Sequence, residues 1–215
     1  MVKPNQAMSN ATLKRLPVYL RFLHERQAKG DEYISSVTIA EHLKLNAVQV
    51  KKDISLVSTV EGKPKIGFLL NQLINDIETS LGYKKSQKAC LVGVGKLGTA
   101  LLSYKGYEKY GLKITAGFDI NEQLYGNTIS GVTIYSMNEL SSFVSKNGVY
   151  MAIIAVQSKD AQAVCDKLVE AGIMAILNFA PVNLQVPNGV FVQDVDIAAS
   201  LAILSTKLNT AMNKD

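Results

Sequence analysis

The feature that most constrains the fold is a Gly-x-Gly-x-x-Gly motif made of Gly93, Gly95 and Gly98. An apolar run of strand type, 89–92, precedes it, and a helix with apolar periodicity follows from Thr99. In this setting the first glycine permits a tight turn, the second lets the backbone approach a pyrophosphate, and the third lets the helix pack closely. The helix amino terminus then offers free N–H groups to the phosphates. The motif predicts a dinucleotide cradle; the alternative is a glycine-rich strand–helix turn without a ligand.

The strand that follows supports the dinucleotide interpretation. It spans 114–118 and ends in Asp119, 26 residues after Gly93. A carboxylate at this position can accept a hydrogen bond from the ribose 2′-hydroxyl of NAD, and it repels a 2′-phosphate. We therefore expect the cofactor to be NAD(H).

Strands and helices keep alternating along the rest of the chain. We expect strands over 132–135, 150–156, 173–177 and 190–192, and helices over 137–146 and 159–171, the latter capped by Ser158. This order predicts a parallel α/β sheet of Rossmann type. The segment Asn178-Phe179-Ala180-Pro181 leaves the carboxyl end of a strand, where open α/β sheets bind ligands. A last helix over 194–208 is apolar on more than one side, so docking on another subunit and burial in its own domain both fit.

The first part of the chain carries all of the net charge. Residues 1–85 hold 13 Lys and Arg against 8 Asp and Glu, whereas residues 86–215 hold 10 of each. A local basic surplus is typical of nucleic-acid contact, although a solvated lysine-bearing face would show it too. Helices are predicted over 12–27, 37–43, 47–57 and 69–81, with Ser35 and Ser36 capping the second and Asn46 the third. The tight turn at Lys44 predicts a helix-turn-helix, in which lysine replaces the usual glycine.

The third of these helices has the residues of a DNA-reading surface. Side chains that can read base edges or hold phosphates lie near its start: Asn46, Gln49, Lys51 and Lys52. The segment 58–68 contains Gly62, Pro64 and Gly67 with Lys63 and Lys65, which predicts a basic wing. An ordinary amphipathic helix would also present a polar outer face. The polar segment 83–88 predicts a boundary, which gives domains over 1–83, 84–193 and 194–215.

An NAD-dependent oxidoreductase with an accessory helical domain is the competing hypothesis. Hydride transfer at a carbonyl requires a positioned acid or base, yet His24 and His42 both precede the glycine motif. No tyrosine is followed by lysine four residues later, and about 130 residues leave no room for a substrate domain. We therefore expect a protein that is not an enzyme and has no catalytic residue.

The cysteines and the apolar runs limit the remaining classes. Cys90 and Cys165 lie among apolar neighbours, which predicts buried thiols and no disulfide or metal site. The longest strongly apolar run, 149–156, is far too short for a membrane span. The first residues show no signal-peptide pattern, so we expect a cytoplasmic protein.

Several motifs occur in a fixed order along nearly the whole chain. The first domain has Arg15-Leu16-Pro17, Tyr19-Leu20-Arg21, Ser35-Ser36 and Gln49-Val50-Lys51-Lys52-Asp53. The second has the glycine motif with Leu97 and Tyr104, then Phe118-Asp119, Ala171-Gly172-Ile173, Ile176-Leu177-Asn178-Phe179-Ala180-Pro181 and Val195-Asp196. In these motifs the chain resembles the family of the redox-sensing transcriptional repressor Rex.

The resemblance implies a homodimer whose subunits combine an amino-terminal winged helix with a Rossmann domain. It implies that the last helix is swapped onto the partner subunit, and that the protein senses the NADH/NAD ratio. NADH would then release double-stranded operator DNA. Arg15, Ser35 and Ser36 join the residues named above in the implied DNA-binding set.

The resemblance also implies roles in the nucleotide site, carried over by position. The three glycines would hold the pyrophosphate, with Val94, Lys96 and Leu97 beside them, and Asp119 would hold the adenosine ribose. Val156 and the loop residues Asn178, Phe179, Ala180 and Pro181 would lie along the nicotinamide side, and Ile197 would contact the partner's pocket. Asp196 is the implied switch, bonded to Tyr104 in one state and reaching Arg21 of the DNA domain in the other.

The chain departs from the family pattern at several positions. Lys51 stands where the family usually has Arg, and lysine lacks the bidentate fork of a guanidinium. Lys96 replaces a usual Asn or Arg, and Gln157 replaces a usual proline. The predicted wing differs most, because it lacks the aromatic–glycine pattern and is one residue longer.

Overall fold

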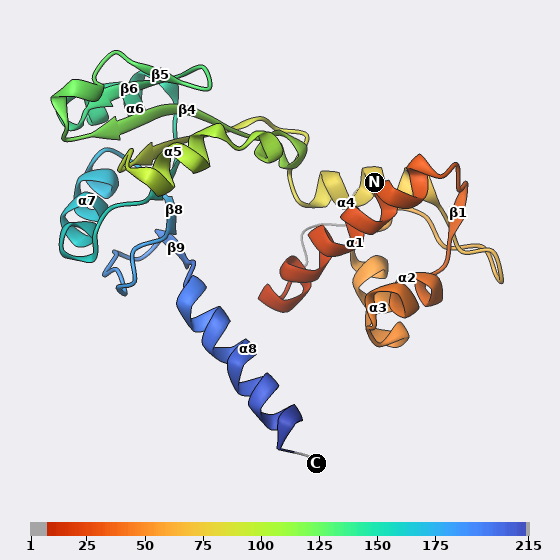
Figure 1. Ribbon diagram of the computed structural model, residues 1–215. Coiled ribbons are helices and arrows are strands. Elements are labelled where there is room, and N and C mark those ends of the chain that lie inside the picture. Colours follow the sequence, from red (N-terminus) through yellow and green to blue (C-terminus); the bar gives the residue numbers. More distant parts are fainter. Residues whose placement is uncertain (1–7, 214–215) are drawn as a thin grey trace. The chain divides into compact units, whose positions relative to one another are not determined.

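The structure, a computed structural model, describes residues 8–213 of the chain (Figure 1). It divides into two compact units, Met1–Lys85 and Ser86–Asp215. The outermost residues of the first and last predicted domains, 1–7 and 214–215, lie outside the described part.

Four helices and a small sheet form the described part of the first unit, residues 8–85. The helices are α1 (Asn10–Ala28), α2 (Ser36–Leu43), α3 (Ala47–Val57) and α4 (Leu70–Ser80), and the antiparallel strands are β1 (Tyr33–Ile34) and β2 (Phe68–Leu69). All four helices bury apolar side chains in one core, among them Leu16, Ile39, Ile54 and Ile77. This arrangement confirms the predicted helical domain with a helix-turn-helix. Pro17 lies inside α1 and not in its first turn.

The turn between α2 and α3 has the predicted caps. Ser35 Oγ accepts a hydrogen bond from the Thr38 N–H at 3.0 Å and caps α2. Asn46 Oδ1 accepts from two N–H groups of the first turn of α3 and caps that helix. Ser36 is the first residue of α2 and does not cap it. Lys44 has φ 54° and ψ 46°, so a lysine adopts the left-handed conformation here, which costs about 1 kcal/mol.

The paired part of the wing is shorter than the segment 58–68 for which a wing is predicted. A single antiparallel bridge joins Lys63 to Gly67, and reciprocal backbone hydrogen bonds of 2.8 and 2.9 Å close the turn between them. Gly67 has φ 100°, and a Cβ there would lie 2.3 Å from the carbonyl oxygen of Ile34. Glycine is therefore required where the wing passes β1. Residues 58–62 have no regular structure.

A seven-stranded sheet organises the second unit. Its parallel strands are β3 (Gln87–Val92), β4 (Leu112–Asp119), β6 (Val132–Ser136), β7 (Met151–Ile154), β8 (Ala175–Asn178) and β9 (Phe191–Asp194), and β5 (Thr128–Ile129) pairs antiparallel with β6 at one edge. The strand order is β5-β6-β4-β3-β7-β8-β9. The chain thus starts in the middle, runs to one edge, returns beside β3 and runs to the other edge. This is the doubly wound Rossmann order, and its switch point lies between β3 and β7.

Helices cover both faces of this sheet (Figure 1). On one face α5 (Lys96–Ser103) packs Leu102 into a cluster with Leu91 and Ile134. On the other face α6 (Leu140–Asn147) and α7 (Ser158–Glu170) bury Val144 and Leu168 in a larger cluster. Three 3-10 helices connect strands and helices: η1 (Lys105–Tyr110), η2 (Glu122–Leu124) and η3 (Met137–Glu139). Both clusters therefore include residues of β3, the strand that leads into the glycine motif.

Some predicted details are wrong. Ser158 is the first residue of α7, and Gln157 holds its N-cap position without a side-chain hydrogen bond. Asp194 belongs to β9, because it pairs with Asn178 of β8, and so it does not start the last helix. The helix predicted over 137–146 begins as the 3-10 helix η3, and β5 was not expected.

The last helix, α8 (Ile197–Met212), has no buried residue in the structure. Its apolar side chains stay exposed, with Ile197 at 65% and Leu201 at 67% of full exposure. Burial within its own domain is therefore excluded for this helix. Cys90 and Cys165 are buried free thiols, as predicted. No helix of the described residues is both long and apolar enough to cross a membrane.

Candidate functional sites

The turn after β3 contains three glycines, and the reason for glycine is not the same at all three positions. Gly93 has φ 96°, and a Cβ there would lie 2.6 Å from the carbonyl oxygen of Ala155. A Cβ on Gly98 would lie 1.9 Å from the carbonyl oxygen of Gly93. The fold itself therefore requires glycine at both positions.

Gly95 is different, because no contact among residues 8–213 requires glycine at this position. Its φ is −74°, which any residue adopts, and no atom lies within 4 Å of a Cβ built there. It occupies the N-cap position of α5 without a side-chain cap, next to the free N–H groups of the first turn. A glycine that packing does not demand, facing open space at a helix amino terminus, fits the role of admitting a phosphate. The residues present therefore fit a dinucleotide.

A cleft of about 490 Å³ lies at this turn. It follows the carboxyl ends of β3 and β7, the two strands at the switch point. Of the predicted nucleotide residues, the cleft brings together Gly93, Gly95, Asp119 and Val156. Sequence reasoning missed other residues that line the cleft, among them Ile120, Met137 and the α7 residues Lys159, Asp160, Ala163, Val164 and Lys167.

Asp119 links the end of β4 to the turn that follows β3. Its Oδ2 accepts a hydrogen bond from the Val94 N–H at 2.6 Å, and its Oδ1 accepts one from the Asn121 N–H at 2.9 Å. The carboxylate is thereby fixed at the end of β4 while each oxygen keeps a further lone pair for a ligand hydroxyl. Val94 itself is buried, so its contribution to the site is this N–H and not its side chain. Lys96 and Leu97 are exposed in the first turn of α5.

The loop after β8 does not line this cleft. Asn178 is fully buried, and its amide nitrogen donates to the carbonyl oxygens of Ala180 and Val182 and to Asp194 Oδ1. Its Oδ1 accepts from the Ala180 N–H at 3.0 Å. The side chain is therefore satisfied within the protein and shapes the loop. Phe179 is half-buried in the cluster of Leu91, Ala180 is buried, and Pro181 is exposed.

The predicted DNA surface contains a buried carboxylate that sequence reasoning did not assign. Asp53, on α3, is only 1% exposed and accepts hydrogen bonds from Arg15 Nε at 2.7 Å and Arg15 Nη2 at 2.9 Å. Tyr19 Oη donates to it at 2.7 Å, Gln49 Nε2 at 3.0 Å, and Thr12 Oγ1 at 3.2 Å. Two predicted DNA contacts, Arg15 and Gln49, are thus engaged with Asp53. Its position between Val50 and Ile54 on the inner face of α3 was the available signal.

Charge and burial oppose each other at Asp53. Burial alone would raise its pKa, but the hydrogen bonds from Arg15, Tyr19 and Gln49 outweigh burial and hold that pKa below its ordinary value. Burial and the hydrogen bond to Asp53 raise the pKa of Tyr19 to about 12. The cluster therefore locks α3 onto α1 with an ionised carboxylate, and it fixes which face of α3 points outward.

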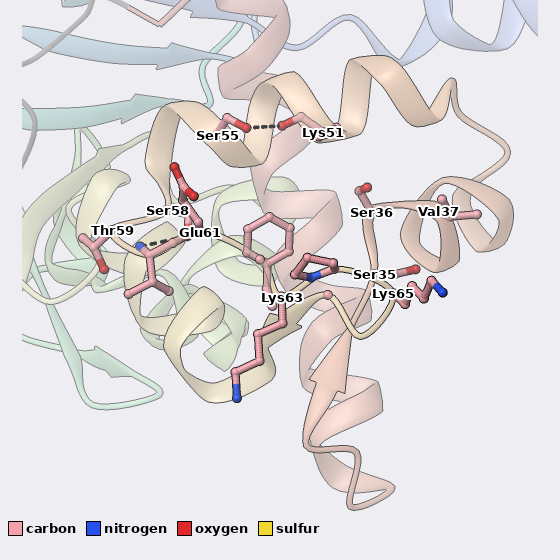
Figure 2. A pocket seen from close by; sticks show the side chains of 15 residues that line it. Ser35, Ser36, Val37, Lys51, Ser55, Ser58, Thr59, Glu61, Lys63 and Lys65 are labelled. Atoms are coloured by element: carbon pink, nitrogen blue, oxygen red, sulfur yellow. Dashed lines mark hydrogen bonds between the residues drawn. The ribbon is translucent and has the colours of Figure 1, made fainter.

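The outward residues of α3 and the wing form the walls of a groove of about 900 Å³. Figure 2 shows Lys51 and Ser55 of α3 on one side, with Lys63 and Lys65 of the wing opposite and Ser35 and Ser36 at the start of α2. Glu61 lies in the same groove. Lys63 Nζ lies 5.4 Å from the centre of the Tyr33 ring. Asn46, the N-cap of α3, and Lys52 of the same helix are exposed but lie outside this groove.

A second buried carboxylate holds the base of the wing. Asp76 of α4 is 3% exposed and accepts from the Thr59 N–H at 2.7 Å, from the Thr59 hydroxyl and from Gln72 Nε2. This residue fixes the irregular segment 58–62 to α4. Sequence reasoning missed it, since an acid in a helix pattern gives no sign of a partner so far along the chain.

The predicted switch residues have these surroundings. Asp196 Oδ1 accepts from the Ala199 N–H at 2.7 Å and caps α8. Tyr104 is 59% exposed and meets the ring of Tyr107 edge to face at 5.0 Å. Arg21 is exposed on α1. No group of three or more His, Cys, Asp and Glu within residues 8–213 could hold a metal ion.

Two family models match the chain, one in each unit. The model described as "Putative DNA-binding protein N-terminus" matches residues 7–55, and the model described as "CoA binding domain" matches residues 84–182.

Curated relatives cover both units together. The chain is 40% identical over 199 residues to the redox-sensing transcriptional repressor Rex of Treponema denticola, covering 93% of this chain and 94% of that one. It is 40% identical over 200 residues to the Rex protein of Desulfitobacterium hafniense, covering 93% and 95%. The chain belongs to the Rex family. These relatives are named as transcriptional repressors, which decides against the oxidoreductase hypothesis.

Solved structures agree with this family over the whole length. RSP, a Rex-family repressor, matches with a TM-score of 0.86 and 31% identity over 97% of both chains. RSP in complex with β-NAD⁺ and operator DNA matches with a TM-score of 0.90 and 32% identity over 97% of this chain and 95% of that one. The predicted fold, a helical DNA-binding domain followed by a Rossmann-like domain, is thereby confirmed.

Proposed function

We propose that this protein is a DNA-binding transcriptional repressor that senses the NADH/NAD ratio and releases operator DNA when NADH binds. The observation that carries the proposal is its likeness, over 97% of the chain, to RSP, which has been crystallised with β-NAD⁺ and operator DNA and with β-NADH. The cleft at Gly95 and Asp119 and the lysine-lined groove supply the two sites that such a sensor needs. A repressor acts where the DNA is, so we also propose a cytoplasmic location.

In the nucleotide site, the backbone at Gly95 and the first turn of α5 would hold the pyrophosphate. Asp119, fixed by two backbone N–H groups, would accept the hydroxyls of the adenosine ribose. The loop after β8 is braced by Asn178 and would set one edge of the nicotinamide site, with Phe179 as its apolar part. An apolar surface favours the neutral reduced ring over the cationic oxidised ring, because a cation loses hydration there.

In the DNA site, α3 would enter the major groove and the wing would follow the backbone. Lys51 and Lys52 on α3 and Lys63 and Lys65 on the wing would neutralise phosphates. Arg15 would act mainly through Asp53, by holding α3 in position, because its guanidinium is already engaged by both carboxylate oxygens.

Dimerisation would complete the fold. The 16 residues of α8 contain no buried side chain, and exposed apolar area on this scale marks an interaction surface. We propose that α8 is swapped onto a second copy of the chain, where Ile197 would reach the partner's nucleotide site. Asp196 at its start would carry the switch between Tyr104 and Arg21.

The direct test is selection of duplexes from a random pool, first with NAD and then with NADH. The expected result is a selected palindromic sequence whose binding is lost when NADH replaces NAD. The nucleotide affinities are measured in parallel by calorimetry. Nucleotide binding without any selected duplex would refute the repressor, and a selected duplex that NADH does not release would refute the sensor.

A further inference from the structure

Val48 is an exposed apolar residue in the first turn of α3. Its exposed fraction is 63%, although the following turns of the same helix bury Val50, Ile54 and Val57 in the core. Its backbone N–H is capped by Asn46 at 2.9 Å, so its position is well fixed. Packing within the chain therefore does not explain why a branched apolar side chain stands here.

The direction in which Val48 points follows from the anchored face of α3. Val50, Asp53, Ile54 and Val57 are buried against the rest of the unit, and at about 100° per residue Val48 lies on the opposite side from Val50. It lines an open groove of about 590 Å³ together with Lys52, Ser55 and Leu56 of the same helix. In a helix-turn-helix, the first residues of the second helix are those that reach base edges.

The residues next to Val48 on α3 are suited to groups on DNA other than those that an apolar side chain contacts. Gln49 donates its amide nitrogen to Asp53 Oδ1 at 3.0 Å, which turns this amide toward the protein. Lys51 and Lys52 are exposed cations that suit phosphates or guanine. The only base feature in the major groove that an apolar side chain recognises is the C5-methyl group of thymine.

We propose that Val48 is a specificity-determining residue that contacts the methyl group of one thymine in each operator half-site. This inference rests on the proposed DNA-binding function and adds a base preference to it. The contact gives no hydrogen bond, so it discriminates thymine from cytosine, and also from uracil, through burial of one methyl group.

The test removes that methyl group without changing any hydrogen bond. In the duplex selected by the wild-type protein, each thymine is replaced in turn by uracil, and the dissociation constants are measured by fluorescence anisotropy. One substitution in each half-site should weaken wild-type binding about fourfold, as expected for one buried methyl group. Val48→Ala should weaken binding to the thymine duplex by a similar factor and should no longer distinguish uracil from thymine at that position.

The matched control is Leu56→Ala, which removes an apolar side chain that is 41% exposed at the other end of α3. This variant should keep the full uracil effect. The proposal is overturned if no uracil substitution weakens wild-type binding, or if Val48→Ala retains the same uracil effect as the wild-type protein. A failure to select any duplex would instead refute the DNA-binding function itself, and the inference with it.

Discussion

Replacing Gly95 by alanine should separate nucleotide binding from folding. The open space around a Cβ at this position, and a φ of −74°, mean that alanine fits the free protein. Alanine is a poorer N-cap residue than glycine by about 0.5–1 kcal/mol. It also restricts the unfolded chain, which offsets about 0.4–1 kcal/mol. The net change in the free energy of unfolding should therefore be close to zero.

Binding should respond very differently to the same methyl group. If the pyrophosphate lies against the backbone of Gly95, the new Cβ occupies that space. Overpacking of this kind costs about 1–3 kcal/mol, which raises the dissociation constant for NADH about 5- to 150-fold. The assay is a titration followed by NADH fluorescence, with urea unfolding of the same preparations.

The other two glycines provide the contrast. Gly98→Ala and Gly93→Ala place a Cβ 1.9 Å and 2.6 Å from backbone oxygens, so both should lower the free energy of unfolding. Wild-type affinity for NADH in a folded Gly95→Ala protein would refute the assignment of the pyrophosphate to this turn.

Three further substitutions test the other parts of the site. Asp53→Asn should lower the free energy of unfolding by about 3 kcal/mol at pH 7, because Arg15 loses its carboxylate. The pKa of Asp53 is lowered in the folded state, so the stabilisation by its carboxylate is present above the unfolded-state pKa of about 3.9 and is lost as the pH falls through the folded-state pKa. The free energies of unfolding of the two proteins, measured with urea, should therefore converge in acid. Glu61→Gln removes a negative charge from the wing groove and should tighten operator binding about two- to fivefold, with the gain shrinking as salt is added. Asp196→Asn keeps an N-cap acceptor for α8 but loses the carboxylate, so NADH should bind normally and no longer release DNA; unchanged release, measured by anisotropy, would exclude Asp196 as the switch.

Local signals in the sequence were sufficient for much of this fold. The caps at Ser35 and Asn46 act within three residues, so the residue type alone identifies them. The two central strands β3 and β7 contain continuous apolar runs, 89–92 and 151–154, as expected for parallel strands covered on both faces. The glycine motif places a turn, and the structure shows that two of its glycines are required by backbone contacts.

The sequence was a poorer guide wherever a side chain finds its partner far along the chain. Asp53 and Arg15 are 38 residues apart, and Asp76 and Thr59 are 17 apart. Helical periodicity can place such an acid on the inner face, as it does for Asp53 between Val50 and Ile54, but it does not identify the distant partner that satisfies the carboxylate. The sequence therefore predicts Arg15 and Gln49 as DNA contacts without indicating that both also bond to Asp53.

Asn178 shows how a residue outside the cleft can still matter to a sensor. Its side chain holds the loop at Ala180 and Val182, and it donates to Asp194 Oδ1 at 2.8 Å at the end of β9. The backbone carbonyl oxygen of Asn178 accepts a hydrogen bond from the Val195 N–H at 2.8 Å. Val195 directly precedes Asp196, the N-cap residue of α8. The loop at the proposed nicotinamide edge and the start of α8 are therefore joined by consecutive hydrogen bonds. We therefore expect a ligand that binds more tightly to one position of this loop to favour one position of the first turn of α8 as well, which is the differential contact that coupling requires.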